Sequence, residues 1–165
     1  MSLVFFLRNV PGVVLLSFLL VFAAVPAWSE SAPEFALKDS AGNTVSLEDF
    51  KGKPLVLHFW VSWCPYCKKV QPGLERLVGD NTQHDLKLLG ISFREDEGVV
   101  PQDVLTQRGH TFKTLVFGDD IARAYGVKGT PTTFFISRNG ELVSVTNTSD
   151  PNSPELARMA AAIVR

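Results

Sequence analysis

The sequence contains only two cysteines among its 165 residues, Cys64 and Cys67. So few cysteines exclude a framework of several disulfides, and one bridge across so short a loop stabilises a fold only weakly. The chain also lacks an excess of either charge, since its formal net charge is -1. A near-neutral chain without a basic patch is not typical of nucleic-acid-binding proteins, so we expect no nucleic-acid partner.

Histidine is also scarce, with three residues at positions His58, His84 and His110. A closed tetrahedral zinc site needs two ligands besides the cysteine pair, and these histidines show no paired spacing. We therefore expect neither a metal site nor a cofactor. The sequence has no internal repeat or low-complexity tract, and its 45% of hydrophobic residues suffice for the core of one domain.

The long apolar run of this chain lies near its start. Val13–Val25 carries no charge, follows Arg8, and is followed by small residues suited to cleavage after Ala27 or Ser29. The run is shorter than the roughly 20 apolar residues that a membrane-spanning helix needs. We therefore predict an export signal peptide over residues 1–29, with an uncleaved membrane anchor as the alternative.

Residues 30–34 are small or polar and predict a linker, which one domain at 35–165 follows. In that domain the almost continuously apolar run Leu55–Val61 is typical of a strand buried on both faces of a sheet. Apolar side chains at helical spacing predict an amphipathic helix over 65–78. Further strands are predicted at 35–37, 44–46, 86–93, 112–117, 132–137 and 141–145, and further helices at 100–108, 120–125 and 154–165.

The predicted helix gives the two cysteines different chemistry. Cys64 would stand at its first turn, where unpaired backbone N–H groups and the positive end of the helix dipole favour the thiolate. Cys67 would lie one turn inside, placed to attack a disulfide that Cys64 has formed. The pattern therefore predicts a redox-active disulfide in which Cys64 is the attacking sulfur.

Four segments together resemble the thioredoxin superfamily, and within it the exported thiol–disulfide oxidoreductases of the TlpA/ResA type. These segments are Phe35–Asp39, Val45–Lys53, His58–Cys67 and Tyr125–Ile136. The resemblance implies a thioredoxin-like α/β fold, with a central mixed sheet flanked by helices and an N-terminal β-hairpin. It also implies a cis peptide bond between Thr130 and Pro131 that faces the cysteines.

The same resemblance implies which groups contact the substrate. Trp63, Pro65 and Tyr66 lie beside the attacking sulfur in the sequence. We expect these three residues to bind the substrate together with Thr130 and Pro131, because the backbone of Thr130 would pair with the substrate backbone.

Two groups are candidates for handling the proton of Cys67. In the resembled family a glutamate after the second core strand lies under the active site, and Glu95 holds the matching place. A partly buried carboxylate can accept a proton, although Glu95 also begins a charged run that would suit a solvated loop. His58 stands where thioredoxins have a buried acid, and it is either a proton handler or a hydrogen-bonded core histidine.

We predict an exported reductase that cleaves disulfides in partner proteins. We expect a monomer that is periplasmic or otherwise exported, and that is anchored to the inner membrane if the leader is uncleaved. The resemblance implies the partners, which are disulfide-containing exported proteins, such as apocytochrome c during cytochrome c maturation, and a membrane thiol carrier that donates electrons. Membrane contact is expected only if the leader is retained.

Two alternatives stay open on the sequence alone. The first is an oxidase that forms disulfides, although Tyr66 lacks the charge that a histidine there would offer the Cys64 thiolate. The second is a non-catalytic binding module or metal chaperone that uses Cys64, Cys67 and His58. The reduction potential of the cysteine pair separates the reductase from the oxidase.

Overall fold

The computed structural model describes residues 30–165, so the leader predicted at 1–29 lies outside the described residues. The strands are β1 (Glu30–Ser31), β2 (Ala36–Asp39), β3 (Thr44–Ser46), β4 (Leu55–Trp60), β5 (Lys87–Ser92), β6 (Lys113–Val116), β7 (Thr132–Ile136) and β8 (Glu141–Thr146). The helices are α1 (Pro65–Gly79), α2 (Pro101–Gln107), α3 (Asp119–Ala124) and α4 (Pro154–Ile163), with short 3-10 helices η1 (Leu47–Phe50) and η2 (Thr82–His84). Every strand and helix that the periodicity predicts is present.

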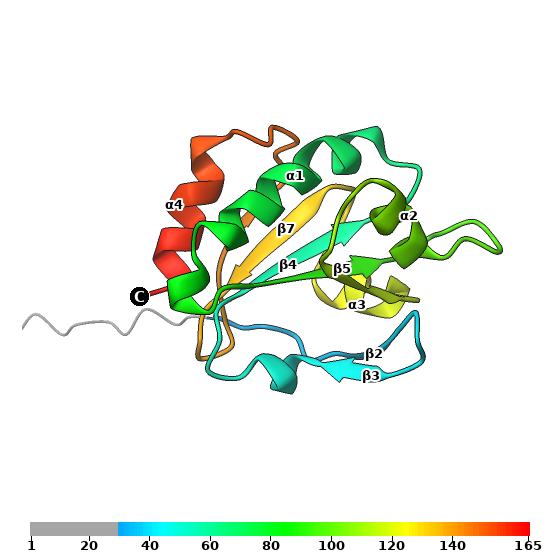
Figure 1. Ribbon diagram of the computed structural model, residues 1–165. Coiled ribbons are helices and arrows are strands. Elements are labelled where there is room, and N and C mark those ends of the chain that lie inside the picture. Colours follow the sequence, from blue (N-terminus) through cyan, green and yellow to red (C-terminus); the bar gives the residue numbers. More distant parts are fainter. Residues whose placement is uncertain (1–29) are drawn as a thin grey trace, which may run out of the picture.

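The strands form one mixed sheet in the order β1-β8-β7-β4-β5-β6-β2-β3. Helices α1 and α4 lie on one side of this sheet, and α3 lies on the other (Figure 1). The hairpin of β2 and β3 forms one edge, where β2 also pairs with β6. The predicted α/β architecture, with its central mixed sheet and N-terminal hairpin, is confirmed.

Strand β4 lies in the middle of the sheet because it is apolar along most of its length, and all six of its residues are buried. It pairs in parallel with β5, where Trp60 faces Ser92, and antiparallel with β7, where Phe59 faces Thr132. The end of β4 therefore lies beside the end of β5 and the start of β7. The candidate site forms at this edge of the sheet.

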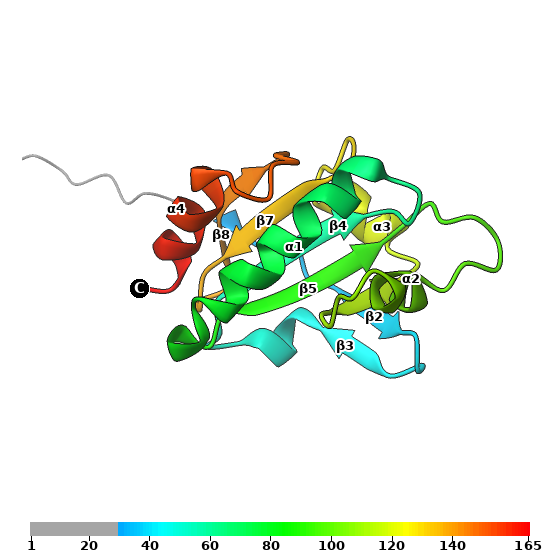
Figure 2. The ribbon, with the colours of Figure 1, turned by 45° about the horizontal axis from the view of Figure 1, so that its top comes forward.

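Buried side chains form a separate cluster on each face of the sheet. Under α1 and α4 (Figure 2) the cluster contains Val56, Val70, Leu74, Leu77, Leu86, Phe135, Leu156, Ala160 and Ile163. On the other face, four aromatic rings pack with centroids between 5.1 and 6.3 Å apart, and these are Phe59, Phe93, Tyr125 and Phe134. Since a fully buried large apolar side chain contributes about 1.5–3 kcal/mol, these clusters hold the helices to the sheet.

Residues 30–34, predicted as a linker, differ from that expectation because their first part joins the sheet. Glu30 and Ser31 pair with β8, and the N–H of Ala32 donates to the carbonyl of Gly140 at 2.8 Å. The side chain of Ala32 is also buried. A strand of two residues has no alternating pattern of its own, so its partner edge on β8 determines it.

Gly73 lies in α1 where the helix meets the loop before α4, and a methyl group there would overlap the backbone of Pro151. We expect Gly73→Ala to lower the free energy of unfolding by about 1–3 kcal/mol, because overpacking outweighs the gain in helix propensity. Urea unfolding measures the change. Gly79→Ala, at the open end of the same helix, is the control and should be neutral or slightly stabilising. Equal losses in both variants would contradict the packing argument.

Candidate active site

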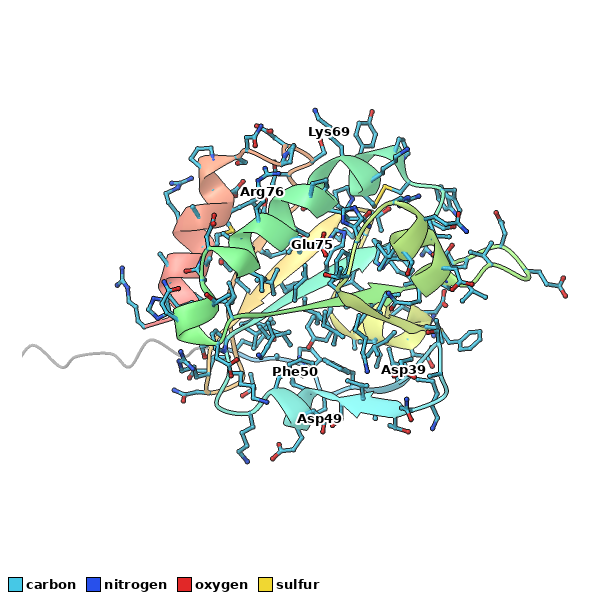
Figure 3. All side chains as sticks on the ribbon, in the orientation of Figure 1. Asp39, Asp49, Phe50, Lys69, Glu75 and Arg76 are labelled. Atoms are coloured by element: carbon cyan, nitrogen blue, oxygen red, sulfur yellow. A yellow bond between two sulfur atoms is a disulfide. The ribbon has the colours of Figure 1, made fainter. Side chains whose placement is uncertain are left out.

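The two cysteines form a disulfide at the start of α1, visible as a yellow bond in Figure 3. Cys64 caps the helix, and its Sγ accepts a hydrogen bond from the backbone N–H of Cys67 at 3.1 Å. Pro65 occupies the first helical position, where its missing N–H costs nothing. Cys64 therefore stands where the sequence predicts it, at a helix start whose backbone donors favour negative charge on sulfur.

The surface around the disulfide is aromatic. Cys64 is 4% exposed and Cys67 is fully buried, whereas Trp63 and Tyr66 are 61% and 62% exposed. The indole Nε1 of Trp63 donates to the carbonyl of Arg94 at 3.4 Å, which fixes one of these rings beside the loop after β5. A protein partner that approaches Cys64 would therefore contact two exposed rings.

The peptide bond between Thr130 and Pro131 is cis, as the family resemblance implies. The carbonyl oxygen of Thr130 lies 3.8 Å from the Sγ of Cys64, so this loop faces the cysteines. The side-chain amide of Asn147 donates to the carbonyl of Pro131 at 2.9 Å and to Thr132 at 2.6 Å. These bonds from Asn147, the residue that follows β8, hold the loop in place.

Ser62, two residues before Cys64, is held between side chains of opposite charge. Its N–H donates to both carboxylate oxygens of Glu95, at 2.8 and 3.1 Å, and its hydroxyl donates to the same carboxylate. Its carbonyl accepts a hydrogen bond from the guanidinium of Arg108. Partial burial lowers the pKa of Arg108, and the nearby charge of Glu95 opposes that shift. Hydrogen bonds to charged groups are among the stronger ones, so the entry to the active-site loop is firmly positioned.

Glu95 thus lies beside the active-site loop, as the resemblance implies, and is half-buried. The hydroxyl of Ser92, at the end of β5, also donates to its carboxylate. Among the described residues its hydrogen bonds go to Ser62 and Ser92 and not to Cys67, so its part in proton transfer stays a prediction. Asp96 and Glu97 are exposed, in agreement with a solvated loop.

The sequence predicts Arg108 only as the last residue of a helix, and its contacts with the active-site loop were not foreseen. Besides Ser62, its guanidinium donates to the Oε1 of Gln71 at 3.3 Å and lies 5.7 Å from the ring centroid of Trp60. Gln71 is one turn beyond Cys67 in α1 and is fully buried. No local pattern marks such a residue, because its partners lie 37 and 46 positions away in the chain.

His58 is fully buried in β4, and its Nδ1 shares a hydrogen bond with the hydroxyl of Thr133 in β7 at 2.9 Å. Its Nε2 has no partner among the described residues. Burial, with a smaller contribution from the charge of His110, lowers the pKa of His58 to about 3. The ring is therefore neutral near pH 7, which favours a hydrogen-bonded core histidine over a proton handler.

Comparisons with known proteins agree with this geometry. The model of the AhpC/TSA family matches residues 29–145. The thiol-disulfide oxidoreductase ResA of Halalkalibacterium halodurans is 32% identical over 117 residues, which are 70% of this chain and 66% of that protein. ResA of Bacillus subtilis is 31% identical over 76% of this chain and 71% of its own length. The chain thus spans about two thirds of the length of these curated relatives.

Solved structures show the same fold. A DsbE-type thiol:disulfide interchange protein of Chlorobium tepidum matches with a TM-score of 0.75 and 27% identity, over 83% of this chain and 97% of that one. A secreted disulfide oxidoreductase of Mycobacterium tuberculosis, homologous to Escherichia coli DsbE, matches with a TM-score of 0.66 and 27% identity, over 78% and 95%. The thioredoxin-like fold expected from the sequence is confirmed.

The buried position of His58 predicts how stability depends on pH. The unfolded chain takes up a proton on this residue below about pH 6.5, whereas the folded protein does so only near pH 3. As far as His58 is concerned, the free energy of unfolding is therefore highest above pH 6.5 and falls as the pH decreases toward 3. We expect His58 to account for a loss of about 2 kcal/mol between pH 7 and pH 5.

Urea unfolding at both pH values measures this loss, with His58→Gln as the comparison, because glutamine can still bond to Thr133 but does not titrate. The wild type should lose more stability than the variant. Equal pH dependence in the two proteins would show that His58 is solvated in the folded state.

Proposed function

Because the chain belongs to the AhpC/TSA family, and within it to the thiol–disulfide oxidoreductases of the ResA type, we propose that it reduces disulfides in exported partner proteins. The observation that carries this proposal is the Cys64–Cys67 pair at the start of α1, with Thr130 lying against the Cys64 sulfur. A disulfide between residues only three positions apart adds little stability. We therefore infer that this pair serves thiol–disulfide exchange.

The reaction begins with the reduced protein. The thiolate of Cys64 attacks one sulfur of the partner's disulfide, a bond forms between these two sulfurs, and the partner's other sulfur leaves as a thiolate that takes up a proton. Cys67 then loses its proton and attacks the Cys64 sulfur. The second partner sulfur leaves, so two electrons have passed to the partner and the enzyme holds the Cys64–Cys67 disulfide.

Groups around the disulfide support binding of a polypeptide. Trp63, Pro65 and Tyr66 are exposed beside Cys64 and offer apolar contacts. Thr130, a half-buried residue next to buried Pro131, offers backbone hydrogen-bonding groups to an extended partner segment. We assign substrate binding to these five residues.

Cys67 needs a proton acceptor because the thiolate is the attacking form and its sulfur is fully buried, away from solvent. His58 is a weak base, since its pKa lies at about 3. We therefore assign the proton to Glu95, whose half-buried carboxylate follows β5 at the same edge of the sheet. Proton transfer near neutral pH is a role that positioned carboxylates fill in other enzymes.

Export is supported by the apolar leader pattern at Val13–Val25 and by the likeness to a secreted mycobacterial protein. Within residues 30–165, no helix is both long and apolar enough to cross a bilayer. We propose a periplasmic monomer, free or anchored by its leader, with exported disulfide-containing proteins such as apocytochrome c as substrates. Each turnover leaves the enzyme oxidised, so a membrane thiol carrier would return two electrons to it.

The two cysteines should respond differently to substitution. Cys64→Ser is expected to abolish disulfide reduction, because the attacking sulfur is lost. Cys67→Ser should still attack and should accumulate a mixed disulfide with the partner, because nothing resolves it. Mass spectrometry of alkylated samples detects that species. If Cys64→Ser accumulates it instead, the two roles are reversed.

The direction of the reaction depends on the reduction potential. With Tyr66 uncharged and Lys68 exposed to screening solvent, we expect a value nearer the reducing end of the superfamily, about -270 mV, than the oxidising end near -120 mV. Equilibration with dithiothreitol or glutathione buffers measures it. A value near -120 mV, with a mostly oxidised pool in cells whose thiol carrier is intact, would establish the oxidase alternative.

A further inference from the structure

Phe117 has an unusual position for a large apolar residue. The sequence predicts it as the last residue of a strand, but β6 ends at Val116 and Phe117 turns away with φ of +59°. Bulky residues rarely adopt this left-handed conformation, and strained backbone tends to occur at functional positions. The side chain is 83% exposed, although the N–H of Gly118 anchors the turn to Ser92 at 3.0 Å.

A groove of about 450 Å³ adjoins Phe117 at the carboxyl ends of β5 and β6. In Figure 2 the long loop between β5 and α2 projects beyond the sheet at this end. The apolar part of the groove is lined by Phe93, Val99, Val100, Val116 and Phe117. Arg94, at the start of this loop, is a second non-glycine residue with positive φ, +53°. Two of the three non-glycine residues with positive φ in residues 30–165 thus line this groove, and the third is Asp85.

Two residues that line the groove, Arg94 and Glu95, also bind the active-site loop. The carbonyl of Arg94 accepts the hydrogen bond from Trp63, the exposed ring next to Cys64. Glu95, which also lines the groove, holds Ser62. A polypeptide whose cysteine meets Cys64 could therefore extend from Trp63 into the groove.

The charge of the groove indicates the kind of polypeptide that fits. Four acidic residues line it, Glu95, Asp96, Glu97 and Asp119. The guanidinium of Arg94 lies over the ring of Phe93, with 5.5 Å to its centroid, and supplies one positive charge. The lining is thus apolar inside and predominantly negative, which complements an apolar side chain flanked by lysine or arginine.

We propose that this groove binds the partner segment next to the disulfide, with an apolar side chain of that segment against Phe117 and basic residues at the acidic rim. The inference rests on the proposed function and adds to it the class of partner. Phe117 is suited to such a contact for two reasons. Its side chain is apolar and exposed, and its backbone adopts a conformation that is unfavourable for a bulky residue.

The test compares Phe117→Asn with the wild type. Asparagine tolerates the left-handed conformation, so the variant should fold at least as stably as the wild type. One probe is a synthetic peptide with an internal disulfide, a neighbouring leucine and flanking lysines, and a second peptide replaces leucine and lysines by serines. The third probe is 2-hydroxyethyl disulfide, a small neutral disulfide that has no apolar side chain or basic group to place in the groove.

We expect Phe117→Asn to lower kcat/KM at least tenfold for the leucine–lysine peptide and to leave 2-hydroxyethyl disulfide unaffected. The wild type should prefer that peptide to the serine peptide by a similar factor. Val145→Asn removes an exposed apolar side chain from β8 and should change neither rate. If Phe117→Asn unfolds, Phe117→Gly replaces it, because glycine also accepts positive φ.

Equal rates for both peptides, or an unchanged rate in Phe117→Asn, would overturn the groove proposal while the oxidoreductase function stands. Failure of the wild type to reduce even 2-hydroxyethyl disulfide would instead contradict the proposed function itself.

Discussion

The hydrogen-bonded ladders on both sides of β4 determine where every group of the site lies. On one side the pairing of Trp60 with Ser92 aligns the ends of β4 and β5, so the loops that follow them meet and Glu95 reaches Ser62. On the other side, the pairing of Phe59 with Thr132 brings the preceding cis proline loop to the end of β4. A slip of one residue in either ladder would turn side chains to the opposite face and dismantle the site.

The site combines a rigid frame with a reactive helix start. Ser62 is bound at its N–H, its hydroxyl and its carbonyl, so the chain enters α1 along a fixed path. His58 is buried in β4, and its neutral ring adds no charge to the site. The two charged side chains that bind Ser62, Glu95 and Arg108, have opposite signs. What distinguishes the cysteine sulfurs is therefore their place on the helix, with Cys64 capping it and Cys67 buried one turn later.

The sequence predicted those parts that depend on local pattern. Continuous apolar character gave the position of Leu55–Trp60, and the Pro65 start of α1 followed from the residues around the cysteines. The cis bond before Pro131 came from family resemblance and not from the residues alone. Parts that depend on contacts between residues far apart in the chain were missed, such as the hydrogen bond from Arg108 to the carbonyl of Ser62. Phe117 was misplaced, because the strand predicted at 112–117 gives no warning that the backbone turns to positive φ one residue before its end.

The groove loops and the redox centre are built from different parts of the chain. The β5–α2 and β6–α3 connections line the groove, whereas the exchange chemistry resides at the start of α1 and in the cis proline loop. Apart from Glu95, which binds Ser62 and to which we assign the proton of Cys67, residues of these connections can therefore change with little effect on the sulfur chemistry. On the proposed function, changes confined to these two connections would alter which partner proteins bind while the cysteine pair is kept.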